Sequence, residues 1–202
     1  MHGWAYLLAL ESSNFDLYVI EISILILLLN GALLIGSAIF LSQYQTAALA
    51  ALMLLTPYLD KAFQPQLTFV NKPLNIFIAT FSIAICTFGF IYEYLSLELI
   101  IYTLTISALA EEWFFRVYFQ SKVITFTLNF TNKKLGVLTG IVLTSIFFSG
   151  LHAIAQNNML MMALIFFPSM IYGYIYYKTR DFLLITNIHF ISNILLYLLK
   201  PN

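Results

Sequence analysis

The chain has 202 residues, of which 61% are hydrophobic and only 9% are charged. A soluble domain carries about 25% charged residues, so the composition excludes an ordinary soluble protein and indicates an integral membrane protein. Nine basic residues balance nine acidic ones, which argues against a nucleic-acid partner, because such partners select an excess of basic charge. The single cysteine, Cys86, excludes an intrachain disulfide and a zinc site built from cysteines. Its apolar surroundings are typical of a small core residue.

Seven apolar runs predict transmembrane helices, because a helix needs about 20 mostly apolar residues to cross the hydrocarbon core. They are residues 17–41, 46–59, 74–92, 95 to beyond 119, 135–155, 159–177 and 182–199. The second run is short and contains Pro57, which leaves six spans as the alternative to seven. The expected fold class is all-α, a single polytopic transmembrane helical bundle without a separate soluble domain.

The basic residues predict the orientation of the chain in the membrane. They gather in three loops, with Lys61 and Lys72 in one, Lys122, Lys133 and Lys134 in another, and Lys178 and Arg180 in a third. These loops share one side in an alternating topology, and the positive-inside rule places that side in the cytoplasm and the C-terminus outside. The N-terminus is then cytoplasmic with seven spans and outside with six. Without organelle-targeting features or a signal-peptide cleavage site, the pattern predicts a bacterial plasma (inner) membrane.

Two adjacent glutamates, Glu111 and Glu112, lie within the fourth apolar run. A carboxylate at the bilayer centre costs roughly 3 kcal/mol on insertion scales, so the pair needs partners or a function. Glu112 and Arg116 are spaced i, i+4 and share a helix face, which predicts an ion pair. Glu111 points about 100° away around the helix and has no cation on its own face. It is therefore a candidate for general acid–base chemistry, and a polar seam without chemistry is the alternative.

Two histidines lie in later apolar runs, His152 in the fifth and His189 in the last. Asn193 follows His189 at i, i+4, so both side chains project from one face. Gly150, just before His152, is expected to allow two helix backbones to approach closely. Together with Glu111, these side chains supply a base, proton carriers and an amide donor. Hydrolysis uses such groups to activate water and to stabilise an oxyanion.

Three motifs in chain order resemble those of the CPBP (Abi) family of glutamic-type intramembrane proteases, which includes the type II CAAX prenyl endopeptidases and bacteriocin-processing relatives. The motifs are Glu111-Glu112-x-x-x-Arg116, Phe148-x-x-x-His152 and His189-x-x-x-Asn193. The resemblance covers about residues 95–199, which are expected to form a catalytic transmembrane core. Residues 1–94 are expected to hold transmembrane spans of unassigned role. One departure is Val117, where many relatives have a glycine after the arginine.

The resemblance implies an intramembrane endopeptidase that hydrolyses a peptide bond of a membrane-associated protein or peptide. It implies that Glu111 activates water with the help of His152, and that His189 and Asn193 stabilise the oxyanion. It leaves the predicted ion pair of the first motif as structural support. The expected partners are a membrane-embedded or lipid-anchored substrate and the bilayer. Processing of a C-terminal sorting signal or of a CAAX-like sequence are the candidate roles.

No cofactor is expected, although members of this family are often described as metalloproteases. Catalytic zinc takes about three protein ligands and a water, and Glu111, His152 and His189 would be those ligands if the enzyme were metal-dependent. The chain lacks the His-Glu-x-x-His helix motif of many zinc proteases, which favours the metal-free mechanism.

Two other functions remain open from the sequence. A non-catalytic bacteriocin-immunity or scaffold protein would keep the same fold, and its motif residues would then be dispensable. A proton-coupled transporter would use the buried acid and the histidines as a proton relay, but the sequence has no inverted repeat of the kind such carriers use.

Overall fold

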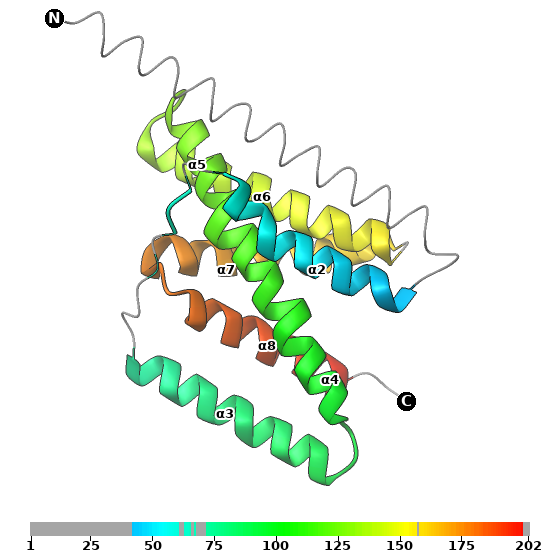
Figure 1. Ribbon diagram of the computed structural model, residues 1–202. Helices are drawn as coiled ribbons and strands as arrows, with labels where there is room; N and C mark the ends of the chain where they lie inside the picture. Colours follow the sequence, from blue (N-terminus) through cyan, green and yellow to red (C-terminus); the bar gives the residue numbers. More distant parts are fainter. Residues whose placement is uncertain (1–41, 61–62, 66, 68–71, 157, 200–202) are drawn as a thin grey trace, which may run out of the picture.

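The computed structural model describes residues 42–60, 63–65, 67, 72–156 and 158–199 (Figure 1). This part of the chain is helical and contains no strand, which confirms the predicted all-α class for these residues. Its helices are α2 (Ser42–Leu59), α3 (Lys72–Ile91), α4 (Leu97–Tyr102), η1 (Thr103–Ala110), η2 (Trp113–Gln120), α5 (Ser121–Leu128), α6 (Lys133–Ala155), α7 (Met159–Thr179) and α8 (Phe182–Leu198). The predicted span 17–41 lies outside the described residues.

The four segments from α4 to α5 form one continuous helix over residues 97–128. It begins at Ser96, whose hydroxyl accepts a hydrogen bond from the Leu99 backbone N–H and so caps the first turn. Its segments pack against α2, α6, α7 and α8, and in Figure 1 this green helix runs obliquely past all four. The predicted continuation beyond residue 119 is therefore confirmed, and it sets the middle of this helix deep in the bundle.

Two stretches of the long helix, η1 and η2, are π-helical. A π-helix closes its backbone hydrogen bonds from residue i to i+5, is rare, and often occurs at functional sites. Glu111 and Glu112 lie between these two wider stretches. The paired acids therefore occupy the most irregular part of an otherwise regular bundle.

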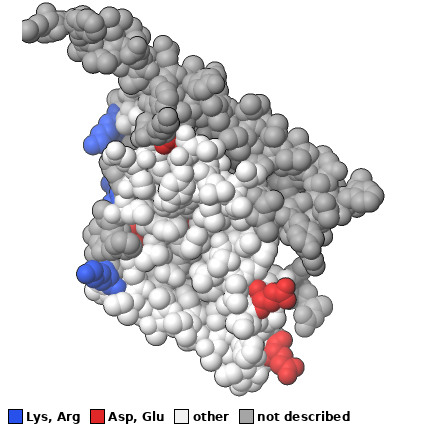
Figure 2. Space-filling model, viewed as in Figure 1, with Lys and Arg blue, Asp and Glu red and all other residues white. Residues whose placement is uncertain are grey.

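Three helices of the described residues are long and apolar enough to cross a membrane: Lys72–Ile91, Lys133–Ile154 and Met159–Thr179. Leu49–Leu59 and Phe182–Leu198 are apolar but shorter. A membrane protein follows from these helices, while the total of seven or six spans stays a prediction. Figure 2 shows Lys and Arg side chains along one edge of the molecule, the most prominent acidic side chains at the opposite corner, and smaller acidic patches near the basic edge. The assignment of the basic edge to the cytoplasm also stays a prediction.

Val117 occupies a buried apolar cluster with Trp113, Tyr176 and Ile185, and it is only 1% exposed. This is the position where the sequence departs from the glycine of many relatives. Its isopropyl group fills space between the long helix, α7 and α8, since the two last members of the cluster come from those helices. The valine in place of glycine is therefore accommodated by close packing with its neighbours, since protein interiors leave few voids as large as this side chain.

Close helix contact through glycine occurs at Gly140 rather than at Gly150. A Cβ built at Gly140 of α6 would lie 3.0 Å from the Ile124 Cα and 3.1 Å from its backbone nitrogen in α5. A Cβ built at Gly150 would meet no atom of the described residues within 4 Å. The predicted close backbone approach at Gly150 is therefore wrong for the described residues, because the side of α6 on which Gly150 lies meets none of them closely.

We expect Gly140→Ala to destabilise the protein and Gly150→Ala to leave its stability unchanged or slightly improved. The new methyl group at Gly140 presses on the backbone of α5, which cannot rotate aside, and overpacking of this kind costs about 1–3 kcal/mol. At Gly150 the methyl group has space, and alanine is the better helix former. Thermal unfolding of both variants in the same detergent measures the difference. Equal melting temperatures for the two variants would contradict the packing described here.

Candidate active site

The site residues come from three helices. Glu111 and Glu112 lie in the middle of the long helix, His152 lies in the last turn of α6, and His189 and Asn193 lie on α8. The structure brings Glu111 to within 4 Å of both His152 and His189, and Glu112 to within 2.8 Å of His189. Asn193 lies one turn further along α8 than His189.

The start of α8 is fixed by Asp181, which is fully buried. One carboxylate oxygen accepts a hydrogen bond from the Leu184 backbone N–H at 3.1 Å and caps the helix. The other accepts a hydrogen bond from Asn75 Nδ2 of α3 at 2.7 Å. The cap therefore sets both where α8 begins and how it lies against α3, and His189 follows two turns later.

Glu112 is the buried centre of the site and has two partners. Its Oε2 lies 3.1 Å from Arg116 Nε, so the predicted i, i+4 contact is present. Its Oε1 lies 2.8 Å from His189 Nδ1. Glu112 and Arg116 are both 0% exposed, and a buried ion pair persists only when the remaining lone pairs and protons find partners. Arg116 Nη2 meets part of this need by donating to Ser169 Oγ at 2.9 Å, while its buried Nη1 has no hydrogen-bond partner among the described groups.

The contact between Glu112 and His189 was not foreseen from the sequence. Helix spacing predicts the contact with Arg116 only, since His189 lies on a helix far along the chain. Glu112 therefore orients an imidazole of the site as well as balancing the arginine. The contact between Arg116 and Ser169 was not foreseen either. In the sequence, Ser169 stands out only because it follows Pro168 inside α7.

Hydrogen bonds fix the tautomer of both histidines. His152 Nδ1 lies 2.9 Å from the Phe148 carbonyl oxygen, and a carbonyl can only accept, so this nitrogen carries the proton. His189 Nδ1 likewise donates to the Glu112 carboxylate. In each neutral ring the Nε2 atom is then left as an acceptor. In their neutral forms both histidines thus direct an acceptor nitrogen, Nε2, toward the centre of the site.

Glu111 Oε2 lies between these two Nε2 atoms, 3.8 Å from that of His152 and 3.9 Å from that of His189. This oxygen is buried and accepts no hydrogen bond from the described protein groups. Three acceptor atoms therefore converge on one small volume, at distances too long for direct hydrogen bonds. A group that carries protons, such as a water or a reacting amide, satisfies such an arrangement.

Two aromatic rings enclose the histidines. The Phe148 ring lies 4.5 Å from the His152 ring and 6.2 Å from the His189 ring, measured between centroids. The Tyr172 ring lies 5.5 Å from the His189 ring on α8, and its hydroxyl donates to Ser192 Oγ at 2.7 Å. The Arg116 guanidinium also lies over the Phe148 ring, 5.2 Å from its centroid. These rings hold the imidazoles in place and keep the site apolar around its few polar atoms.

Asn193 is held by a residue that the sequence did not single out. Its Nδ2 donates to Ser107 Oγ at 3.0 Å, and Ser107 precedes Glu111 by four residues on the long helix. The two helices are therefore joined at two levels, once through Glu111, Glu112 and His189, and once through this bond.

Glu111, His152 and His189 offer the donor atoms that a catalytic zinc site uses. Two histidines and one carboxylate are suitable ligands by type. Ligands about 2.0–2.1 Å from a tetrahedral metal lie about 3.4 Å apart, whereas Glu111 Oε2 is 3.8 Å and 3.9 Å from the two nitrogens. Within the described ranges no group of three or more His, Cys, Asp or Glu residues has the arrangement of a metal site. The residues fit zinc in type but not in spacing.

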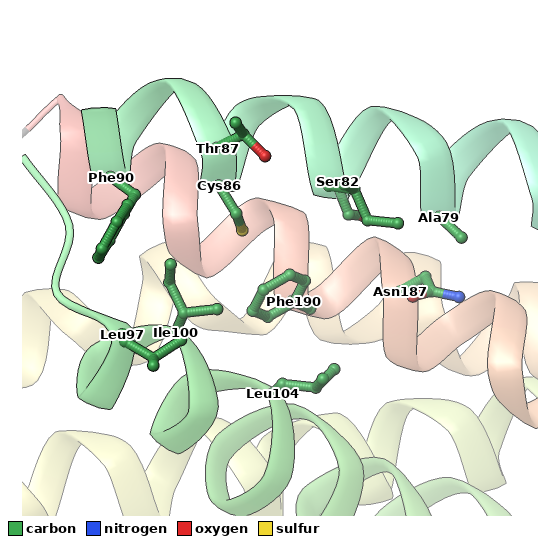
Figure 3. A pocket seen from close by; sticks show the side chains of 11 residues that line it. Ala79, Ser82, Cys86, Thr87, Phe90, Leu97, Ile100, Leu104, Asn187 and Phe190 are labelled. Atoms are coloured by element: carbon green, nitrogen blue, oxygen red, sulfur yellow. The ribbon is translucent and has the colours of Figure 1, made fainter. Parts of the chain in front are cut away.

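A separate cavity of about 560 Å³ lies between α3, the start of the long helix and α8 (Figure 3). Figure 3 shows Cys86 of α3, Leu104 of η1 and Phe190 of α8 around it. The lining includes none of the three converging residues Glu111, His152 and His189. The polar site and this apolar cavity are therefore different places in the bundle. Cys86 is partly buried, lines this cavity and also packs against the buried apolar cluster that contains Phe190.

Comparison with known protein families matches the part of the chain that carries the site. Residues 93–195 match the family described as type II CAAX prenyl endopeptidase Rce1-like. No curated protein and no solved structure matches the chain. The match covers the long helix, α6, α7 and most of α8, and so includes all three motifs that carried the resemblance. The chain therefore belongs to the Rce1-like family of type II CAAX prenyl endopeptidases, a family of intramembrane proteases.

Proposed function

We propose that the chain is an intramembrane endopeptidase of the glutamic type, with Glu111 as the base that activates the attacking water. The observation that supports this most directly is the convergence of Glu111 Oε2 with His152 Nε2 and His189 Nε2, at 3.8 Å and 3.9 Å. A carboxylate and two imidazoles around one small volume can take a proton from water and return it to a leaving group.

The first step is attack of water on the carbonyl carbon of the scissile peptide bond. The water oxygen forms the new C–O bond while one of its protons passes to Glu111, and the carbonyl π electrons move onto oxygen to give a tetrahedral oxyanion. His152 accepts a hydrogen bond from the same water through Nε2, because its Nδ1 proton is held by the Phe148 carbonyl. Collapse of the oxyanion breaks the C–N bond, and the amine leaves with the proton stored on Glu111.

His189 and Asn193 are the proposed oxyanion donors. In this role His189 acts in its protonated form, in which Nε2–H donates to the oxyanion while Nδ1–H stays bound to the Glu112 carboxylate at 2.8 Å. The Asn193 amide carries two N–H groups, one of which is directed to Ser107, so the other is available to the oxyanion. Glu112 and Arg116 support the site by fixing the His189 ring.

The proposed substrate is a membrane-embedded or lipid-anchored protein or peptide, and the proposed roles are C-terminal sorting-signal or CAAX-like processing. Mass spectrometry of membrane-protein C-termini tests both the activity and its target. A strain lacking the gene is compared with strains restored by the wild type and by Glu111→Ala. We expect a set of unprocessed C-termini in the deletion strain that only the wild type returns to their mature length. Equal rescue by Glu111→Ala would indicate a non-catalytic immunity or scaffold protein instead.

We expect the peptidase activity to survive removal of metal ions, because the proposed mechanism uses protein groups alone. Purified protein is dialysed against 1,10-phenanthroline and then against metal-free buffer, and the residual metal is measured by mass spectrometry. Cleavage of a membrane-anchored peptide is expected to stay within about twofold of the untreated enzyme. Loss of activity that returns on addition of zinc would assign Glu111, His152 and His189 as ligands and overturn the metal-free mechanism.

A further inference from the structure

We infer that Ser107 is a positioning residue for Asn193, and that it aims the free amide hydrogen of Asn193 at the developing oxyanion. The inference rests on the proposed function and adds to it a residue outside the three motifs. Ser107 is half-buried on η1, four residues before Glu111, and Asn193 is half-buried on α8. Their contact is the hydrogen bond of 3.0 Å from Asn193 Nδ2 to Ser107 Oγ.

The hydroxyl of Ser107 differs from its neighbours in what it contacts. Thr105, on the same stretch of helix, donates to the Ile101 carbonyl four residues earlier, at 2.8 Å. Ser82 of α3 does the same to the Ile78 carbonyl, also at 2.8 Å. Such bonds to the preceding turn are the usual use of a helical hydroxyl. Ser107 instead accepts a hydrogen bond from a side chain on another helix, and that side chain belongs to the site.

Asn193 needs an anchor of this kind. The terminal torsion of an asparagine side chain has broad preferences and does not by itself fix the amide plane. One N–H bound to Ser107 fixes the plane, and the second N–H of the same nitrogen then points in a set direction. Oxyanion stabilisation depends on donors that are already aimed before the charge develops. The hydrogen bond that Asn193 donates to Ser107 therefore stabilises the transition state and does not contribute to substrate binding.

The position of Ser107 gives it a second geometric property. It lies on the same continuous helix as Glu111, and Asn193 lies on the same helix as His189. The general base and the anchor of the amide are thus built into one rigid element, and the two proposed oxyanion donors into another. A shift between these helices changes both pairs together, so the hydrogen bond also keeps the base and the oxyanion donors in register.

A double-mutant cycle measured on full-length protein in lipid nanodiscs tests the inference. Cleavage of a membrane-anchored peptide is measured for the wild type, Ser107→Ala, Asn193→Ala and the double variant. Loss of one hydrogen bond corresponds to about tenfold in rate, so Ser107→Ala is expected to lower kcat about tenfold with KM unchanged. In the Asn193→Ala background the same substitution is expected to have no further effect. Ser107→Thr keeps the hydroxyl and is expected to restore most of the rate.

The matched control is Thr105→Ala, which removes a hydroxyl from the same stretch of helix but only its bond to the helix's own backbone. It is expected to leave kcat and KM unchanged. A tenfold loss from Ser107→Ala that persists in the Asn193→Ala background would overturn the inference, as would an effect on KM alone. A Ser107→Ala variant as active as the wild type would also overturn it.

A measurement independent of activity separates failure of the inference from failure of the proposed function. The protein is labelled with ¹⁵N-asparagine, and the Asn193 side-chain amide signal is assigned by its absence in Asn193→Ala. Ser107→Ala is expected to move this signal and to speed exchange of its protons with water, while Thr105→Ala leaves it in place. An unchanged Asn193 signal in Ser107→Ala refutes the contact. If the signal moves in Ser107→Ala but the wild type cleaves no better than Glu111→Gln, the contact between Ser107 and Asn193 is confirmed. Its role in catalysis then fails together with the proposed function.

Discussion

Glu111→Gln is expected to lower kcat by about 10²–10⁴-fold, the range that a general base contributes, without unfolding the protein. The amide keeps the shape of the carboxylate but cannot accept a proton from water. It occupies the same space between the Nε2 atoms of His152 and His189, which lie 3.8 Å and 3.9 Å from Glu111 Oε2. The fold should therefore tolerate the change while the chemical step fails. Single-turnover cleavage of a membrane-anchored peptide measures the chemical step directly.

The control for this substitution is Glu98→Gln, which removes an exposed carboxylate from the first turn of the same long helix. It is expected to leave the rate within about twofold of the wild type. His152→Ala should lower the rate with Glu111 still present, because Glu111 then holds the water alone. Retention of most of the activity in Glu111→Gln would remove the proposed base and with it the glutamic mechanism.

Arg116→Leu is expected to destabilise the protein by about 3–5 kcal/mol, the usual cost of breaking a buried ion pair. It removes the cation 3.1 Å from Glu112 Oε2 and leaves a carboxylate that is 0% exposed with His189 as its remaining partner. It also removes the donor to Ser169 and the guanidinium over the Phe148 ring. Denaturation of the purified protein in mixed micelles, followed by tryptophan fluorescence, measures the loss.

Lys133→Leu provides the comparison, because it also exchanges a basic residue for leucine but at the exposed start of α6. Exposed substitutions usually stay within about 0.5 kcal/mol of the wild type. The double variant Glu112→Gln/Arg116→Leu is expected to recover part of the stability, since it leaves no buried charge unpaired. It is expected to stay poorly active, because His189 loses its carboxylate partner. An Arg116→Leu variant as stable as the wild type would contradict the contribution of the Glu112–Arg116 ion pair to stability.

The sequence predicted the contacts that depend on spacing within one helix. Glu112 and Arg116 meet because residues four apart share a face, and a π-helical stretch between them did not prevent it. The gathering of Glu111, His152 and His189 followed from a resemblance and not from local spacing. Geometry alone could place each residue on its own helix but could not say which faces meet.

The contacts that were missed all join different helices. The bonds from His189 to Glu112 and from Asn193 to Ser107 depend on how α8 is rotated against the long helix, and no sequence spacing encodes that rotation. The expectation at Gly150 failed for the same reason, because a glycine permits a close approach without saying which neighbour will use it. The two π-helical stretches were also beyond the sequence, since the choice between i+4 and i+5 bonding is decided by packing.

The π-helical stretch η1 precedes both glutamates, so its length sets how the start of the long helix is turned relative to them. A π-helical stretch accommodates an extra residue in a helix, and deletion of one residue from η1 would turn everything before it by about 100° relative to Glu111. Ser107 and the start of the long helix would then face elsewhere, while Glu112 and Arg116, which follow η1, would keep their register. A single-residue insertion or deletion ahead of Glu111 would therefore redirect what approaches this carboxylate, with the buried ion pair of Glu112 and Arg116 left intact.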